Sequence, residues 1–151
     1  MKKILLIPFA VLLFSCNSTK KTVEESNNNS SEVKKISTTN LYEVLTQSAY
    51  QGKEEKSYEV IKDKTSLQNL YALVNDTEVP KVDFSKSRIV ALFLGQRNSG
   101  GYEIKVKNVE EKAGKIVVTV EETKPEGMAT MAITNPYTIV KINSTKEIIF
   151  K

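Results

Sequence analysis

The sequence predicts an α+β fold that is mostly β: a small antiparallel sheet or a β-sandwich-like domain with one short helix. Three observations lead to this prediction. Apolar residues recur at every second position in residues 102–107 and 116–121, as in half-buried strands. Residues 89–94 are apolar throughout, which is typical of a strand covered on both faces. A single stretch after Thr65 carries apolar residues at helical spacing.

The first elements of this domain are two short strands and the helix. Residues 41–52 and 57–61 predict strands on either side of a charged loop. Thr65 followed by Gln68 matches a capping box, in which both side chains bond to free N–H groups at a helix start. The helix is expected to end near Asn75. Its apolar positions follow at i, i+3, i+4 and i+7: Leu67, Leu70, Tyr71 and Val74.

The rest of the domain predicts strands. The two alternating runs flank Ala113 and Gly114, a dipeptide that suits a hairpin turn. Residues 137–142 and 147–150 predict a last pair of strands around a short polar loop. About 110 residues from position 41 onward are enough for one hydrophobic core and too few for two.

The N-terminal residues resemble a bacterial lipoprotein signal. Two lysines follow Met1, and residues 4–14 form an apolar run that is shorter than the ~20 residues a spanning helix needs. Leu13-Phe14-Ser15-Cys16 then resembles a lipobox. The resemblance implies cleavage before Cys16 and acylation of Cys16, so that acyl chains hold the protein in membrane lipid. The alternative is an ordinary signal peptide with an incidental cysteine.

The chain therefore divides into three expected parts: a signal peptide at 1–15, the lipidated Cys16 with a disordered tether at 16–40, and a globular domain at 41–151. The tether is polar and buries too little apolar surface to offset its ordering entropy. The expected location is the cell envelope, through a stable anchor of two or three acyl chains. If the source is Gram-negative we expect the outer membrane, because Asn17 is not the aspartate that favours inner-membrane retention.

The composition excludes several kinds of site. The chain has no histidine and one cysteine, which removes Ser-His-Asp and Cys-His nucleophile systems, zinc sites built from these ligands, and intrachain disulfides. The net charge of +4 includes Lys2 and Lys3, and no basic stripe with interleaved aromatics indicates nucleic acid binding. A serine–lysine pair is the remaining nucleophile chemistry, but the candidate serines, Ser85 and Ser144, lie in predicted loops. The sequence thus predicts no catalytic residue, metal or cofactor.

Two segments contain candidate binding surfaces, and we expect residues 96–101 of the first and 127–134 of the second to be exposed. Residues 95–102 follow the all-apolar strand and contain adjacent glycines, which permit close backbone approach. Residues 125–137 carry two methionines among alanines, an adaptable apolar surface. The structural alternatives are a tight β connection for the first and a loop leading into a core strand for the second. The candidate partner-binding residues are Arg97, Asn98, Ser99, Gly100, Gly101, Tyr102, Met128 and Met131.

At these segments the chain resembles the C-terminal domain of the PrcB family. The resemblance lies in the pattern Gly-x-x-x-Ser-Gly-Gly-Tyr at 95–102, the alternating strand after it, and residues 135–142. It covers roughly residues 57–150. The family is named for a lipoprotein subunit of a cell-surface protease complex. The resemblance implies a lipid-anchored accessory protein that stabilises or helps assemble an envelope protease, and it supplies no catalytic residues.

Three functions follow from these observations. The first, which the sequence favours, is a non-catalytic envelope lipoprotein that binds a partner protein. The second is a peptidase inhibitor on an immunoglobulin-like sandwich, because residues 98–102 faintly resemble the wedge loop of chagasin-like inhibitors. The third is an enzyme with a serine–lysine dyad, although no Ser-x-x-Lys motif opens a helix.

Overall fold

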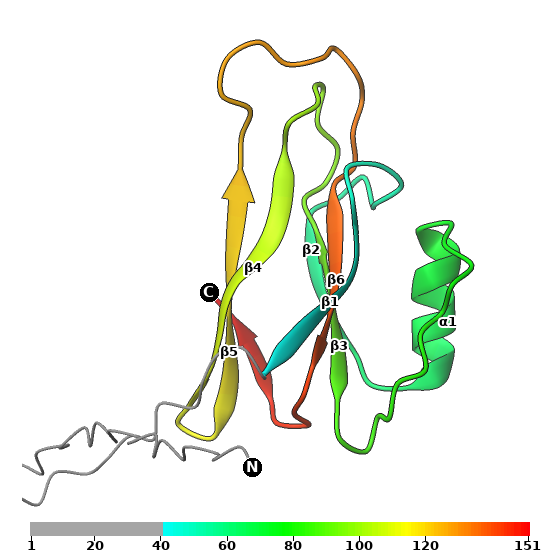
Figure 1. Ribbon diagram of the computed structural model, residues 1–151, viewed down its shortest axis with the longest axis vertical. Coiled ribbons are helices and arrows are strands. Elements are labelled where there is room, and N and C mark those ends of the chain that lie inside the picture. The colour runs from blue at the N-terminus through cyan, green and yellow to red at the C-terminus, as the bar shows by residue number, and fades with distance from the viewer. Residues whose placement is uncertain (1–40) are drawn as a thin grey trace, which may run out of the picture. The chain divides into compact units, whose positions relative to one another are not determined.

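The domain is a β-sandwich with one helix packed on its outside (Figure 1). The computed structural model describes residues 41–151, so the expected signal peptide, Cys16 and the expected tether lie outside the described residues. The predicted fold class is confirmed. In chain order the elements are β1 (Tyr42–Ser48), β2 (Ser57–Ile61), α1 (Lys64–Leu73), β3 (Arg88–Phe93), β4 (Glu103–Lys112), β5 (Lys115–Thr123), β6 (Tyr137–Ile142) and β7 (Ile148–Phe150).

The strands form two sheets. One sheet is antiparallel and has four strands in the order β1-β6-β3-β2. The other has the order β4-β5-β7, in which β4 and β5 form a hairpin and β7 runs parallel to β5. The predicted last pair of strands is therefore wrong, because β6 and β7 belong to different sheets. β6 already pairs along its whole length with β1 on one side and β3 on the other, which leaves β7 no free edge there.

The apolar strand β3 lies between two cores, as its sequence predicts. Val90 and Leu92 face the three-stranded sheet, whereas Ile89, Ala91 and Phe93 face α1. All five side chains are fully buried. The alternation arises because successive side chains of a strand point to opposite faces. Burying a large aliphatic or aromatic side chain stabilises a fold by about 1.5–3 kcal/mol, so this strand contributes heavily to both cores.

The helix begins with a different cap from the predicted one. Asp63 is the N-cap: its Oδ1 accepts from the main-chain N–H of Ser66 at 2.8 Å, and its Oδ2 accepts from the Ser66 hydroxyl at 2.8 Å. The capping box at Thr65 is therefore wrong, because the helix begins at Lys64, after the Asp63 cap, and Thr65 already lies inside it. The four apolar positions are all buried, as expected: Leu67, Leu70, Tyr71 and Val74.

The helix ends at Leu73, two residues before the predicted end. Asn75 has φ +54, and the N–H groups of Asn75 and Asp76 bond to the carbonyls of Ala72 and Tyr71 at 3.2 and 2.9 Å. This pair of bonds is a Schellman motif, which closes a helix by satisfying its last carbonyls. No helix in residues 41–151 is long and apolar enough to cross a membrane.

The turns decide where the strands end. The predicted hairpin turn is confirmed: Ala113 and Gly114 have φ +51 and +77, and they join β4 to β5 directly. The first strand, predicted over 41–52, stops at Ser48. The prediction that it continues to residue 52 is wrong. The chain turns away at Gln51, where φ is +67, and the N–H of Gly52 bonds to the β5–β6 connection instead.

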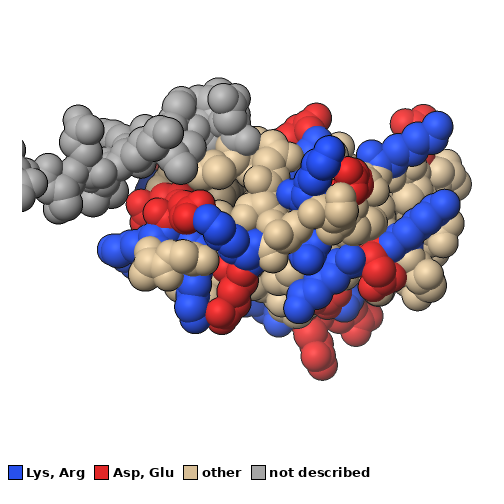
Figure 2. All heavy atoms as spheres, turned by 90° about the horizontal axis from the view of Figure 1, so that it is seen from below, with Lys and Arg blue, Asp and Glu red and all other residues tan. Residues whose placement is uncertain are grey.

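Charges alternate in sign at one end of the domain. Figure 2, which views the domain from its lower end in Figure 1, shows basic and acidic side chains interspersed on that face. Ion pairs link Lys115 with Glu147 at 2.9 Å and Lys146 with Glu111 in this region. Neither sign forms a continuous patch on the visible face.

Candidate functional site

Three connections meet at the other end of the sandwich, and we call this end the tip. They are residues 49–56 between β1 and β2, residues 94–102 between β3 and β4, and residues 124–136 between β5 and β6 (Figure 1). The chain enters the domain at the opposite end. Register shows this directly, because Tyr42 pairs with Ile142 at the start of β1, whereas Ser48 pairs with Tyr137 next to the tip.

The structure bonds the two predicted binding segments to each other. Arg97 and Thr134 form an isolated antiparallel bridge, in which each N–H donates to the other's carbonyl at 2.8 and 2.9 Å. The hydroxyl of buried Thr134 donates to the carbonyl of Ser99 at 2.9 Å. The N–H of Gly100 donates to the carbonyl of Thr130 at 2.9 Å. The 13-residue β5–β6 connection is therefore held in place although it contains no strand.

Asn135 links the third connection to this pair. Its N–H donates to the carbonyl of Ala49 and its carbonyl accepts from the N–H of Gly52, both at 2.9 Å. Its side-chain amide donates to the carbonyl of Lys53 at 3.3 Å. Sequence reasoning gave Asn135 no such role, because nothing local relates it to residues some eighty positions away.

An apolar surface remains exposed on the tip. Met128 and Met131 are fully exposed, and Ile133 is 65% exposed. Ile133 was missed from the sequence, although it stands two positions after Met131. Thr134, in contrast, is buried. Tyr50, on the connection that Asn135 holds, is also about half exposed.

Some of the other candidate residues are exposed on the tip, and others are buried beneath it. Asn98 and Gly101 are exposed, whereas Ser99 is half-buried and Gly100 is buried against Thr130. The expectation of continuous exposure over 96–101 and 127–134 is thus wrong at Gly100 and Thr134, which support the tip from inside.

Arg97 and Tyr102 form a half-buried pair. The guanidinium carbon of Arg97 lies 5.7 Å from the centre of the Tyr102 ring, a cation–π contact. The ring itself packs against the core between the sheets. Tyr102 therefore presents one side to the core and the other to Arg97, so it serves the fold as well as the surface.

A charged cluster near the tip joins the two sheets. Lys56 pairs with Glu122, and the Tyr58 hydroxyl donates to the same carboxylate at 3.0 Å. The hydrogen bond from Lys56 lowers the pKa of Glu122 and raises the pKa of Lys56. Burial raises the pKa of Tyr58, and the hydrogen bond to Glu122 raises it further. The cluster is a set of matched charges, and it holds β2 beside β5.

A groove of about 230 Å³ opens beside the tip, between the end of β1 and the start of β4. Next to it along β6, the hydroxyl of buried Thr138 donates to the carbonyl of Ile104, which ties β6 to the edge of β4. The groove touches the β5–β6 connection only at its last residue, Pro136. Among residues 41–151 there is no group of three or more Asp, Glu, Cys or His side chains that could hold a metal ion. The residues that line the groove are Gln47, Ser48, Ala49, Glu103, Ile104, Pro136 and Tyr137.

Comparison with known proteins identifies the central part of the domain. Residues 88–143 match the family described as PrcB C-terminal. The matched range runs from β3 to β6 and includes two of the three tip connections. The predicted resemblance is confirmed, over a shorter range than the expected 57–150. An uncharacterized protein of Methanocaldococcus jannaschii is 35% identical over 57 residues, which cover 38% of this chain and 35% of that protein. No solved structure matches the chain.

Proposed function

We propose that this protein is a non-catalytic, membrane-anchored accessory protein of the cell envelope that binds a partner protein through its tip. The observation that carries the proposal is the exposure of Met128, Met131 and Ile133 on a connection that hydrogen bonds hold in place. Connections of this length without strands or helices are uncommon in compact domains and are often functional. Exposed methionines suit binding because their side chains adapt to a partner's shape.

The family match supports an envelope protease complex as the partner. The PrcB C-terminal family is associated with a protease complex, and the match includes the connections 94–102 and 124–136. The accessory role would be to stabilise or help assemble that complex. The protein would contribute binding without catalysis, since the tip offers exposed apolar side chains and paired charges.

Anchoring is a separate part of the proposal and depends on Cys16. The lipobox resemblance supports acylation there, with residues 16–40 as the tether. The chain enters the domain at the end opposite the tip. An anchored protein would therefore present the tip away from the membrane, toward other envelope proteins, and in a Gram-negative cell we place it in the outer membrane.

Truncating the methionines is expected to weaken partner capture. Met128→Ala and Met131→Ala should each reduce affinity by about 1–2 kcal/mol, because buried apolar contact is lost at the centre of the surface. The full-length lipidated protein is used to capture envelope proteins, which mass spectrometry identifies, and affinity for the captured partner is then measured. Leu73→Ala is the matched control, because Leu73 is half exposed on α1, away from the tip.

Two outcomes would contradict this use of the tip. Capture that both methionine variants leave unchanged would show that the tip does not bind the partner. A fall in melting temperature in parallel with capture would mean that the methionines serve the fold. The activity of a captured protease separates the roles: an accessory subunit should leave activity unchanged or raise it, whereas an inhibitor should suppress it.

Replacing Cys16 with alanine is expected to block acylation and cleavage, leaving a full-length precursor. The thiol of Cys16 is the acyl acceptor in this interpretation, and alanine provides none. Metabolic labelling with a fatty-acid analogue, followed by mass measurement, checks both points. If the wild-type protein takes up no label, the anchor is absent. Binding through the tip is then tested by the capture experiment alone.

A further inference from the structure

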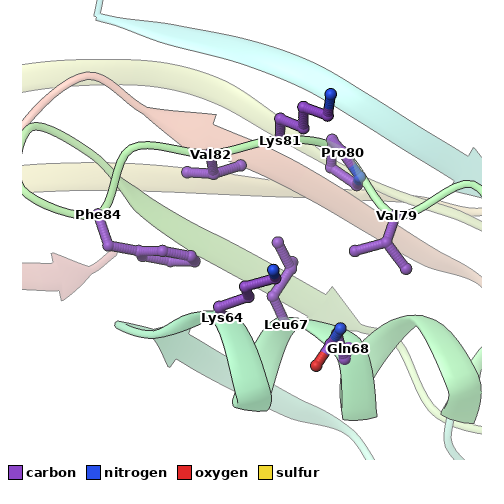
Figure 3. Close-up of a pocket in the computed structure, with 8 residues that line it drawn as sticks. All are labelled: Lys64, Leu67, Gln68, Val79, Pro80, Lys81, Val82 and Phe84. Carbon is purple, nitrogen blue, oxygen red and sulfur yellow. The ribbon is translucent and has the colours of Figure 1, made fainter.

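A hollow of about 340 Å³ lies between α1 and the connection that leads to β3 (Figure 3). Its volume is within the range of small-ligand sites. It lies on the α1 side of the four-stranded sheet, whereas β4 and β5 cover the other face (Figure 1). Five apolar and three polar residues line it: Leu67, Val79, Pro80, Val82 and Phe84, with Lys64, Gln68 and Lys81.

The walls of the hollow are fixed by the protein's own bonds. On the helix side, the Asp63 cap holds the first turn and Leu67 is anchored in the core. On the other side, Asp83 accepts from the N–H and hydroxyl of Ser85 at 3.0 and 2.6 Å, and its carbonyl accepts from the N–H of Ser87 at 3.0 Å. The hollow is therefore formed without a ligand, which lowers the cost of binding one.

Its charge is of one sign. Lys64 stands on the helix, and Lys81 stands on the opposite wall with its side chain extending away from α1, at the outer rim (Figure 3). Val79 and Phe84 lie at the two ends of the hollow. No ion pair within residues 41–151 involves Lys64 or Lys81, although eight other lysines of this region are paired. None of the lining residues is acidic. The complementary ligand carries negative charge beside an apolar group.

The connection also offers main-chain donors. It runs beside α1 and belongs to neither sheet. In the described part of the chain, no hydrogen bond uses the N–H of Lys81 or of Val82. Free main-chain donors beside a side-chain pocket are the features with which sheet edges recognise extended peptides. This favours a peptide over a free amphiphile, which would leave these donors unused.

We infer that this hollow binds an acidic–apolar peptide segment of a partner protein. One large apolar side chain enters between Leu67, Val79 and Phe84. One flanking Asp or Glu carboxylate pairs with Lys64, and a second one pairs with Lys81 at the outer rim of the connection. The peptide carbonyls accept from the free N–H groups of the connection. The site is separate from the tip, so it gives the protein a second, independent binding surface.

The test uses the isotope-labelled full-length protein and three probes: the peptide Asp-Glu-Phe-Glu-Asp, its neutral counterpart Asn-Gln-Phe-Gln-Asn, and dodecanoate. NMR titration should show the acidic peptide shifting the amide signals of Lys64, Lys81 and Val82. The double variant Lys64→Gln/Lys81→Gln should weaken this binding about tenfold, since it removes both ion pairs. Raising the salt concentration should weaken it as well.

The matched control is Lys112→Gln/Lys124→Gln, which removes two exposed lysines elsewhere on the domain and should leave peptide binding unchanged. Equal binding of the neutral peptide would overturn the inference, as would binding of dodecanoate alone. Unchanged affinity in the Lys64/Lys81 variant, with its melting temperature preserved, would also overturn it. Each of these results leaves the partner capture at the tip untouched.

Discussion

Gly95→Ala is expected to lower the free energy of unfolding by about 3 kcal/mol. Gly95 has φ +82, a conformation that costs an alanine about 1–2 kcal/mol. The new Cβ would also lie 2.9 Å from the main-chain nitrogen of Lys56 and 3.0 Å from the carbonyl oxygen of Glu54. These are backbone atoms, so the clash adds about 1–3 kcal/mol of overpacking.

The clash lies where the tip is joined to the sheet. On either side of Gly95, the N–H of Leu94 donates to the carbonyl of Pro136 at 3.0 Å, and the N–H of Gln96 donates to the carbonyl of Glu54 at 2.9 Å. Moving the backbone to relieve the clash strains both bonds. Partner capture should therefore fall in the Gly95→Ala protein even where it remains folded.

Gly114→Ala is the matched control for backbone strain. Gly114 has φ +77, but a Cβ there would meet nothing within 4 Å. We expect a loss of about 1 kcal/mol, from conformation alone. Denaturant unfolding of the two variants separates strain from clash. Equal losses would mean that residues 54–56 move aside without cost and do not brace the tip.

Local patterns predicted the elements whose determinants are local. Residues 89–93 lie in a doubly covered strand because an all-apolar run has no polar face to expose. The Ala113-Gly114 turn followed from its glycine, which accepts positive φ without a steric cost. The helix was found from its apolar spacing, but its cap was not, because Asp63 and Thr65 both suit a helix start and only geometry chooses between them.

Long-range pairing was not predictable in the same way. The strand at 148–150 could have paired with its chain neighbour β6, but both edges of β6 are occupied by strands from distant parts of the chain. Nothing in the sequence of residues 137–150 indicates that both edges of β6 are already paired. The pairing of β7 with β5 is set by which edge remains free once the four-stranded sheet has formed.

The candidate site shows the same division. The exposure of Met128 and Met131 agreed with expectation, since both lie in a stretch without strand periodicity. The support beneath them, through Asn135 and Thr134, depends on contacts across the fold. The hollow beside α1 was missed entirely, because its Lys81 lies in a connection whose sequence carries no recognisable pattern.

Tyr71 is the titratable group that the fold perturbs most clearly. It lies on the inner face of α1 and packs against Ile89, Phe93 and Ile139 of the sheet. Burial, with a smaller contribution from the nearby charge of Asp76, raises the pKa of Tyr71 to about 12. A phenol in the unfolded chain ionises near pH 10. The folded state therefore keeps a proton that the unfolded state has lost between these two values.

Stability is consequently expected to fall as pH rises from about 10 to 12. The contribution of Tyr71 is fully present below pH 10, because both states are then protonated. Above pH 10 only the unfolded state releases the proton, which removes about 1.4 kcal/mol per pH unit and about 2–3 kcal/mol in all. Other groups also titrate in this range, so the measurement compares Tyr71→Phe with the wild type by denaturant unfolding at several pH values. The phenylalanine variant should lose stability less steeply, and parallel curves for the two proteins would show that the Tyr71 hydroxyl ionises freely in the folded state.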